Sequence, residues 1–325
     1  MRRYLTTDDI ADLYCKARQR GRKFILSKLL TSPLTRTLSA FDETAQESSN
    51  WWDVPLVKAR WNKLISGSPE VTFTDYLQRN FLHNSHSLHL LSLGSGACLP
   101  EMALAAEGNF QNITCVDIAA HLLKVAEAQA RQRNLGCMKF LCADARNIHL
   151  EEATLDIIFF NSSLHHFDRV EILLREKIAP ALKPGGLLIF NEYVGPNRFQ
   201  MSEECLSAIN EGLRLIPKKY RIRYKTSIIK HNVAGPGYWR MKLADPSEAV
   251  DARAIIPAAH KIFEPLAEKG FGSNVLTFIL KDIAWHFTAA DDERRNILEQ
   301  LFTFEDKWLA THPPDYLVGV YRLRS

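Results

Sequence analysis

The sequence predicts a doubly wound α/β domain with a mostly parallel sheet, extended by helices at the N-terminus and by helical cap insertions toward the C-terminus. From about residue 88, short apolar runs alternate with helix-length amphipathic stretches. Runs that are apolar at nearly every position are typical of strands buried on both faces of a parallel sheet. Before residue 84 the chain keeps a helical period instead, as at Ile10, Leu13 and Tyr14.

The expected elements follow from these runs in chain order. A helical N-terminal extension is predicted over residues 1–84, an α/β core over 85–195, and C-terminal cap helices with a final strand over 196–325. The turn at Lys183-Pro184-Gly185-Gly186 leads into the fifth strand. Strands are expected at 88–93, 113–116, 139–142, 155–160, 187–190 and 316–323, and helices at 100–107, 119–133, 169–182, 275–287 and 291–304.

Composition limits the class of protein. Of the 325 residues, 46% are hydrophobic and 24% charged, which excludes disordered and fibrous chains. The six cysteines are scattered, with neither a CxxC pair nor metal-ligand spacing. This pattern argues against a disulfide framework and a metal site, and it favours a reducing, cytoplasmic setting. No apolar run approaches the roughly 20 residues of a membrane helix, so no membrane association is expected.

Basic residues gather in two places. The first 28 residues carry eight lysines and arginines against three aspartates, and a second basic stretch runs from 218 to 230. The N-terminal group fits either a solvated helix face or an arm that binds an anionic partner. The net charge of +4 is too small to indicate nucleic acid by itself.

The first strand is followed by a glycine-containing turn, Leu93-Gly94-Ser95-Gly96-Ala97-Cys98-Leu99. In doubly wound sheets this turn lies beside the ligand, and glycines let a ligand approach the backbone. A dinucleotide fingerprint would place a third glycine at Leu99, and no GxxxxGK[ST] segment is present. NAD, FAD and a P-loop site are therefore disfavoured, while a tight turn without a ligand stays open.

Carboxylates follow the next two strands. Asp117 comes directly after the second strand and Asp144 after the third. Asp117 is suited to accept hydrogen bonds from ribose hydroxyls, and Asp144 from an exocyclic amine. Either aspartate alone could be a helix N-cap, but both together with the glycine turn favour a nucleoside site.

On these residues, the stretch from Leu90 to Tyr193 resembles the core of class I S-adenosylmethionine-dependent methyltransferases of the small-molecule type, which have a Rossmann-like fold. The chain departs from the family pattern at Ser92, where an acid is usual, and at Cys98, where a third glycine is usual. The resemblance implies S-adenosyl-L-methionine as cofactor. The cofactor-binding residues it implies are Gly94, Ser95, Gly96, Asp117, Ile118, Asp144, Ala145 and Asn161.

The end of the fourth strand and the fifth strand would face the methyl group. The segment Asn161-Ser162-Ser163-Leu164-His165-His166-Phe167 lacks the Asn-Pro-Pro-Tyr signature of many enzymes that methylate amino groups of nucleic acid bases or of glutamine. His166 is a candidate general base near neutral pH, or a group that packs under the cofactor. Glu192 and Tyr193 are candidate catalytic residues, and an ion pair with Arg198 is the alternative for Glu192.

Four further residues are candidates for binding the methyl acceptor. The segment Gly235-Pro236-Gly237-Tyr238-Trp239-Arg240 could form a lid or acceptor wall, or else a surface turn with a buried tryptophan. The candidates are His165, Arg198, Tyr238 and Trp239.

The predicted function is S-adenosylmethionine-dependent methyl transfer to an oxygen or nitrogen atom of a small metabolite by in-line displacement. The partner expected is a small-molecule methyl acceptor, and nucleic acid is not favoured. The alternatives are an RNA or protein methyltransferase, motivated by the basic segments, and a non-catalytic S-adenosylmethionine-binding protein.

Overall fold

The computed structural model describes residues 2–20 and 49–324, and these form two compact units. The helical unit comprises residues 1–61, 195–248 and 271–315, and the sheet unit comprises 62–194, 249–270 and 316–325. The N-terminal basic residues Arg22, Lys23 and Lys28, and most of the polar segment 42–50, lie outside the described residues.

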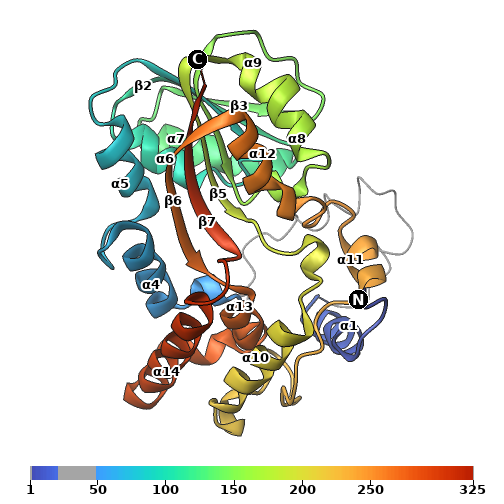
Figure 1. The fold of residues 1–325 in the computed structure, drawn as a ribbon. Coiled ribbons are helices and arrows are strands. Elements are labelled where there is room, and N and C mark those ends of the chain that lie inside the picture. Colours follow the sequence, from blue (N-terminus) through green and yellow to red (C-terminus); the bar gives the residue numbers. More distant parts are fainter. Residues whose placement is uncertain (1, 21–48, 325) are drawn as a thin grey trace. The chain divides into compact units, whose positions relative to one another are not determined.

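The sheet has seven strands in the order β3-β2-β1-β4-β5-β7-β6. Strands β1 to β5 are parallel to their neighbours, and β7 runs antiparallel to β5, from Leu187 opposite Arg322 to Tyr193 opposite Tyr316. Figure 1 shows β7 in red between β5 and β6. The doubly wound, mostly parallel sheet and its final strand are thus confirmed. The strands are β1 (Leu88–Leu93), β2 (Phe110–Asp117), β3 (Met138–Cys142), β4 (Leu155–Asn161), β5 (Leu182–Tyr193), β6 (Phe263–Gly272) and β7 (Tyr316–Leu323).

Helices cover both faces of this sheet. Helices α6 and α7 connect strands in the direction of β3, whereas α8 and α9 lead from β4 to β5 in the opposite direction. Since crossovers between parallel strands are right-handed, the two pairs lie on opposite faces. Helix α12 packs against α8, and α5 against α6; α12 is seen in front of the strands in Figure 1. The helices are α5 (Phe73–Leu77), α6 (Leu99–Ala106), α7 (Ala120–Gln132), α8 (Val170–Leu173), α9 (Ala179–Ala181) and α12 (Ile255–Ile262).

Aromatic side chains fill the core between β4, β5 and β7. Phe159, Phe190 and Tyr321 are fully buried, and the rings of Phe190 and Tyr321 stack with centroids 5.2 Å apart. Gly319 makes this possible, because a Cβ there would lie 2.5 Å from the Tyr321 ring and 2.8 Å from that of Phe190. The apolar runs of β1 and β4 are therefore strands buried on both faces, as predicted. The prediction is wrong for β3, which lies at the other edge of the sheet and is largely exposed.

Strand β6 was not predicted from the sequence. It forms one edge of the sheet beside β7, and most of its first half is exposed. Edge strands carry charged residues and proline because their outer side has no strand to pair with, and β6 carries Glu264, Pro265 and Glu268. Arg322 of β7 pairs with Glu264 at 2.7 Å, and the Tyr321 hydroxyl donates to Glu268.

The helical unit contains five α-helices in the described residues. Helix α1 turns its acidic side inward, where Asp9 pairs with Arg240 at 2.8 Å and Asp12 pairs with Lys281 at 2.8 Å. Within the described chain, every helix is too short or too polar to cross a bilayer. The helices are α1 (Thr7–Arg20), α10 (Glu203–Arg214), α11 (Tyr238–Ala244), α13 (Asn274–Leu280) and α14 (Asp292–Leu309), and α4 (Pro55–Ser66) spans the boundary to the sheet unit.

One predicted helix is wrong in its length. The expected helix over 275–287 ends at Leu280 and resumes as a 3-10 turn over Ala284–Phe287. The interruption has a tertiary cause, because the buried Lys230 ammonium donates to the carbonyls of Phe278, Ile279 and Lys281 at 2.6, 3.1 and 2.7 Å. Those carbonyls are the acceptors that a helix end leaves without partners. Asp282, at φ +67°, then turns the chain away.

Candidate active site

The glycine turn after β1 is anchored to the end of β2 by its own backbone. The N–H groups of Gly94 and Ser95 both donate to the Val116 carbonyl, at 2.8 and 3.1 Å, and that of Gly96 donates to Asp117 Oδ2 at 2.7 Å. A phosphate-binding loop would aim these donors at the ligand. Because β2 takes all three, the turn is not arranged as a phosphate cradle, which supports the prediction against NAD, FAD and P-loop nucleotides.

The two glycines of this turn serve different purposes. Both have positive φ, +72° at Gly94 and +51° at Gly96. A Cβ on Gly94 would lie 2.6 Å from the Cβ of Ser163, so this glycine permits close packing between the turn and the end of β4. A Cβ on Gly96 would meet nothing within 4 Å. Gly96 therefore faces open space, where a ligand could approach the backbone.

Asp117 holds the turn and keeps acceptor capacity. Its Oδ1 accepts from the Ala119 N–H and its Oδ2 from the Gly96 N–H, both at 2.7 Å. A carboxylate has about four lone-pair sites, so each oxygen can accept one more hydrogen bond. The half-buried Asp117 thus remains suited to ribose hydroxyls.

Asp144 is engaged by a neighbour in sequence. The Arg146 side chain donates to both of its oxygens, at 2.9 Å from Nε and 2.7 Å from Nη2, and this lowers the pKa of the Asp144 carboxyl. Lys177 donates to the carbonyls of Ala145 and Arg146, which fixes the loop after β3. The Ile118 carbonyl accepts from the Cys142 thiol, so the loops after β2 and β3 are linked. An adenine contact by Asp144 stays a prediction.

Glu192 lies buried at the base of the turn that follows β4. One of its oxygens accepts from the N–H groups of Ser163 and Leu164 at 2.6 and 2.7 Å, and the other lies 2.6 Å from His165 Nδ1. The carboxylate therefore caps the 3-10 turn Leu164–His166 and orients the His165 ring. These partners, rather than Arg198, occupy both carboxylate oxygens.

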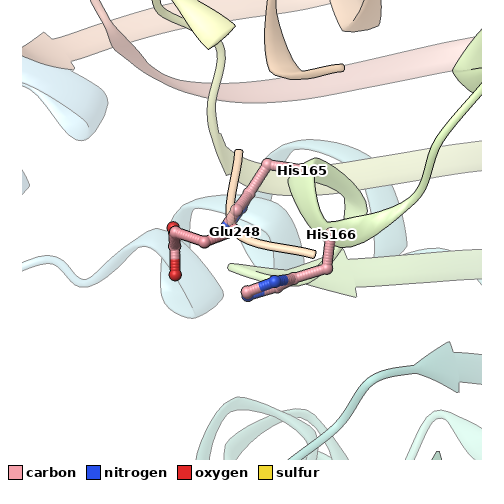
Figure 2. Close-up of side chains that lie close together, drawn as sticks. All are labelled: His165, His166 and Glu248. Atoms are coloured by element: carbon pink, nitrogen blue, oxygen red, sulfur yellow. The ribbon is translucent and has the colours of Figure 1, made fainter. Parts of the chain in front are cut away.

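The two histidines project from the same short turn (Figure 2). Their ring centroids lie 4.3 Å apart; His165 is buried, and His166 is half-buried. Tyr193 is also buried, with its ring against His165 and against Tyr316. Beside them Asn161, at the end of β4, accepts from the Asn191 side chain at 2.9 Å. The structure brings this group together at the carboxyl ends of β4 and β5, the edge where α/β sheets bind ligands.

The other candidate acceptor-binding residues belong to the helical unit. Arg198 donates to the carbonyls of Asp245, Pro246 and Glu248, and burial lowers the pKa of its guanidinium. Tyr238 and Trp239 begin helix α11, and Trp239 is 48% exposed. The alternative of a buried tryptophan in this turn is therefore wrong. The acceptor-binding role of these three residues stays a prediction.

Two residues of this site, Ser163 and Glu101, were not predicted as functional residues from the sequence. Ser163 fixes the turn by donating to the Leu93 carbonyl at 2.6 Å. Glu101, in the first turn of α6, is completely buried and accepts from Ser92 Oγ at 2.5 Å. Neither has a local signal, because a lone serine or glutamate in an amphipathic stretch is normally solvated.

The strands and loops at this edge form an α/β domain whose glycine turn does not cradle phosphate. Residues 91–190, about a third of the chain, match the family model described as a methyltransferase domain. Over these residues the chain is similar to the methyltransferase-domain family, in line with its resemblance to class I S-adenosylmethionine-dependent methyltransferases.

Two curated relatives match over a similar stretch. The chain is 33% identical over 97 residues to the biotin biosynthesis bifunctional protein BioHC of Cellvibrio japonicus, covering 30% of this chain and 18% of the relative. It is also 33% identical over 92 residues to the uncharacterized protein YafE of Escherichia coli, covering 27% of this chain and 44% of that protein. The chain therefore spans less than half the length of either relative.

The fold is also similar to that of a solved structure. Geranyl diphosphate C-methyltransferase from Streptomyces coelicolor A3(2) aligns with a TM-score of 0.54, covering 91% of this chain and 99% of that one. The sequence identity is 11%, so this likeness concerns the fold alone. It agrees with the predicted Rossmann-like methyltransferase fold.

Proposed function

We propose that this chain transfers the methyl group of S-adenosylmethionine to an oxygen or nitrogen atom of a small metabolite. The observation that carries the proposal is the anchored glycine turn, with the open face of Gly96 beside the carboxylate of Asp117. That arrangement suits a nucleoside without a pyrophosphate. In the reaction the bond between sulfur and methyl breaks as the acceptor atom attacks from the opposite side, and S-adenosylhomocysteine leaves.

His166 is the proposed group that takes a proton from the acceptor, where the acceptor must lose one. Its ring is half-buried at the edge of the sheet where the methyl group would lie, and imidazole titrates near neutral pH. Glu192 is buried and both of its oxygens make hydrogen bonds within the turn after β4, which favours a role in orienting His165 over direct proton transfer. Tyr193 would line the same edge. Arg198, Tyr238 and Trp239 remain proposed acceptor contacts.

The contacts of the basic side chains in residues 218–230 favour a small acceptor over nucleic acid. Lys219 pairs with Glu293, and Arg223 pairs with Asp282. Arg221 donates to the carbonyls of Ile216 and Arg214. Cations engaged in this way are less available to phosphates. We also propose a cytoplasmic setting, on the scattered spacing of the six cysteines in the sequence.

Calorimetric titration of the purified protein tests the cofactor. We expect S-adenosylmethionine and S-adenosylhomocysteine to bind at micromolar concentrations and NAD not to bind. Transfer of labelled methyl from S-adenosylmethionine to fractionated metabolites then identifies the acceptor. Binding of NAD instead, or binding of no nucleoside ligand, would contradict the proposal, and labelled RNA or protein as the product would replace the small acceptor.

Alanine at the two glycines should separate packing from ligand binding. Gly94→Ala should lower the free energy of unfolding by about 1–3 kcal/mol, because the new Cβ clashes with Ser163 at a positive φ. Gly96→Ala should lower it by only about 1 kcal/mol from backbone strain, yet weaken S-adenosylmethionine binding about tenfold or more by filling the open face. Urea denaturation and calorimetric titration measure the two quantities.

Gly108→Ala is the matched control for Gly96→Ala. Gly108 also has positive φ, +79°, with nothing within 4 Å of its Cβ position, but it precedes the opposite end of β2. Gly108→Ala should lower the free energy of unfolding about as much as Gly96→Ala does, while its affinity for S-adenosylmethionine should equal that of the wild type. If Gly96→Ala bound S-adenosylmethionine as tightly as Gly108→Ala does, the cofactor would not lie against Gly96.

A further inference from the structure

Glu101 is a fully buried acid whose carboxyl is only partly satisfied. Its Oε1 accepts from Ser92 Oγ at 2.5 Å, while its buried Oε2 has no hydrogen-bond partner in the described part of the chain. A buried polar atom left unsatisfied costs free energy. Such an atom beside a ligand-binding turn therefore calls for a functional explanation.

The Ser92–Glu101 hydrogen bond spans the base of the glycine turn. Ser92 stands two residues before Gly94 on β1, and Glu101 lies in the first turn of α6. Between them, Cys98 ends the turn at the N-cap of α6 in the left-handed region, at φ +55°. The hydrogen bond thus joins the strand that enters the turn to the helix that leaves it. A change at Glu101 is therefore expected to act on the turn that carries Gly94 and Gly96.

The charged neighbour of Glu101 is another acid. Burial and, to a smaller extent, the carboxylate of Asp117 on β2 together raise the pKa of Glu101 to about 7, against the opposing hydrogen bond from Ser92. The nearby Cys115 stays a neutral thiol, because its hydrogen bond with Cys98 and its burial raise its pKa. On α5, which packs against α6, Asp75 is engaged by Thr72 at the helix start. Near neutral pH, Glu101 is therefore partly protonated, and a cation bound at the turn would favour its ionised form.

We propose that Glu101 is a positioning residue of the cofactor site, which holds the glycine turn through Ser92 and gives up its proton when the positively charged cofactor binds. This inference rests on the proposed function. S-adenosylmethionine carries a sulfonium, an ammonium and a carboxylate, for a net charge of +1. S-adenosylhomocysteine has no sulfonium and is neutral overall. The Glu101 proton passes to solvent when the methyl donor binds, and the carboxylate takes a proton back once methyl transfer has removed the sulfonium charge.

Proton release on binding is the measurement that tests this. Titrations at pH 7 in two buffers with different ionisation enthalpies give the number of protons released. We expect S-adenosylmethionine to release about half a proton from Glu101, and S-adenosylhomocysteine clearly less. Since ionisation accompanies binding, affinity for S-adenosylmethionine should rise about tenfold from pH 6 to pH 8 and level off above that.

Variants separate Glu101 from the other titrating groups. Glu101→Gln should remove this proton release and flatten the pH dependence, and Glu101→Asp should restore part of both. Glu107→Gln, at an exposed acid at the end of the same helix, should behave as wild type. Proton release from any other group is common to wild type and Glu101→Gln, so the difference between the two proteins belongs to Glu101.

The outcomes distinguish the two proposals. If the wild type bound neither nucleoside, the proposed function would fail. If it bound both with equal proton release, or if Glu101→Gln released as many protons as wild type, the proposal for Glu101 would be overturned while the function stood. Should Glu101→Gln fail to fold, Ser92→Ala decides instead. Loss of the Ser92 hydrogen bond, which lowers the pKa of Glu101, should move the rise in affinity to higher pH, and an unmoved profile would overturn the proposal.

Discussion

Glu192→Ala is expected to lower the free energy of unfolding by about 3–5 kcal/mol, because each buried donor left without its acceptor costs about 1–3 kcal/mol. The loss follows from three donors that the carboxylate satisfies, the N–H groups of Ser163 and Leu164 and Nδ1 of His165. Without it, two buried N–H groups lose their acceptor and the turn after β4 loses its cap. Urea denaturation measures the change.

Glu192→Gln should retain the fold and change the tautomer of His165 instead. The amide oxygen can still accept from Ser163 and Leu164, but its NH₂ group then faces Nδ1 of His165 and favours the tautomer protonated on Nε2. Nitrogen NMR of the imidazole reports this change. Glu152→Ala, at an exposed acid before β4, is the control and should cost less than about 0.5 kcal/mol. An equally small effect of Glu192→Ala would contradict the capping role.

Asp117→Ala is expected to weaken S-adenosylmethionine binding by about 1–3 kcal/mol, or roughly 5- to 150-fold. Two effects add here. The ribose would lose its acceptor, and the glycine turn would lose the hydrogen bond from Gly96 N–H to Oδ2. Calorimetric titration of the folded variant measures the affinity.

Adenosine distinguishes the two contributions, because it keeps the ribose and lacks the methionine part. A ribose contact predicts that Asp117→Ala weakens adenosine and S-adenosylmethionine by similar factors. A loss confined to S-adenosylmethionine would assign the effect to the turn alone. Asp168→Ala, at an acid whose side chain is 64% exposed, should leave both affinities unchanged. Unchanged affinity in Asp117→Ala would remove Asp117 from the ribose site.

Much of the sheet could be predicted because its signals are local. Strands such as β1 and β4 are buried on both faces, so nearly every residue in them is apolar. Strand β6 lies at an edge of the sheet. Its proline and charged residues interrupt the apolar run by which the other strands were predicted. The segment 275–287, predicted as one helix, has apolar residues on both sides of Lys281-Asp282. Lys230, more than 40 residues away in sequence, binds the carbonyls at its break.

The sequence by itself determined the class of domain and the order of its ligand-facing loops. Glycines and acids at successive strand ends must meet at one edge of a parallel sheet, whatever the rest of the chain does. Only the tertiary structure decided what each acid does. The role of Glu192 is determined by its hydrogen bonds with Ser163 and His165, which are distant along the chain. The role of Glu101 is determined by its hydrogen bond with Ser92, which lies on another element. The state of a buried carboxyl depends on its donors and its solvation, and both exist only once the chain has folded.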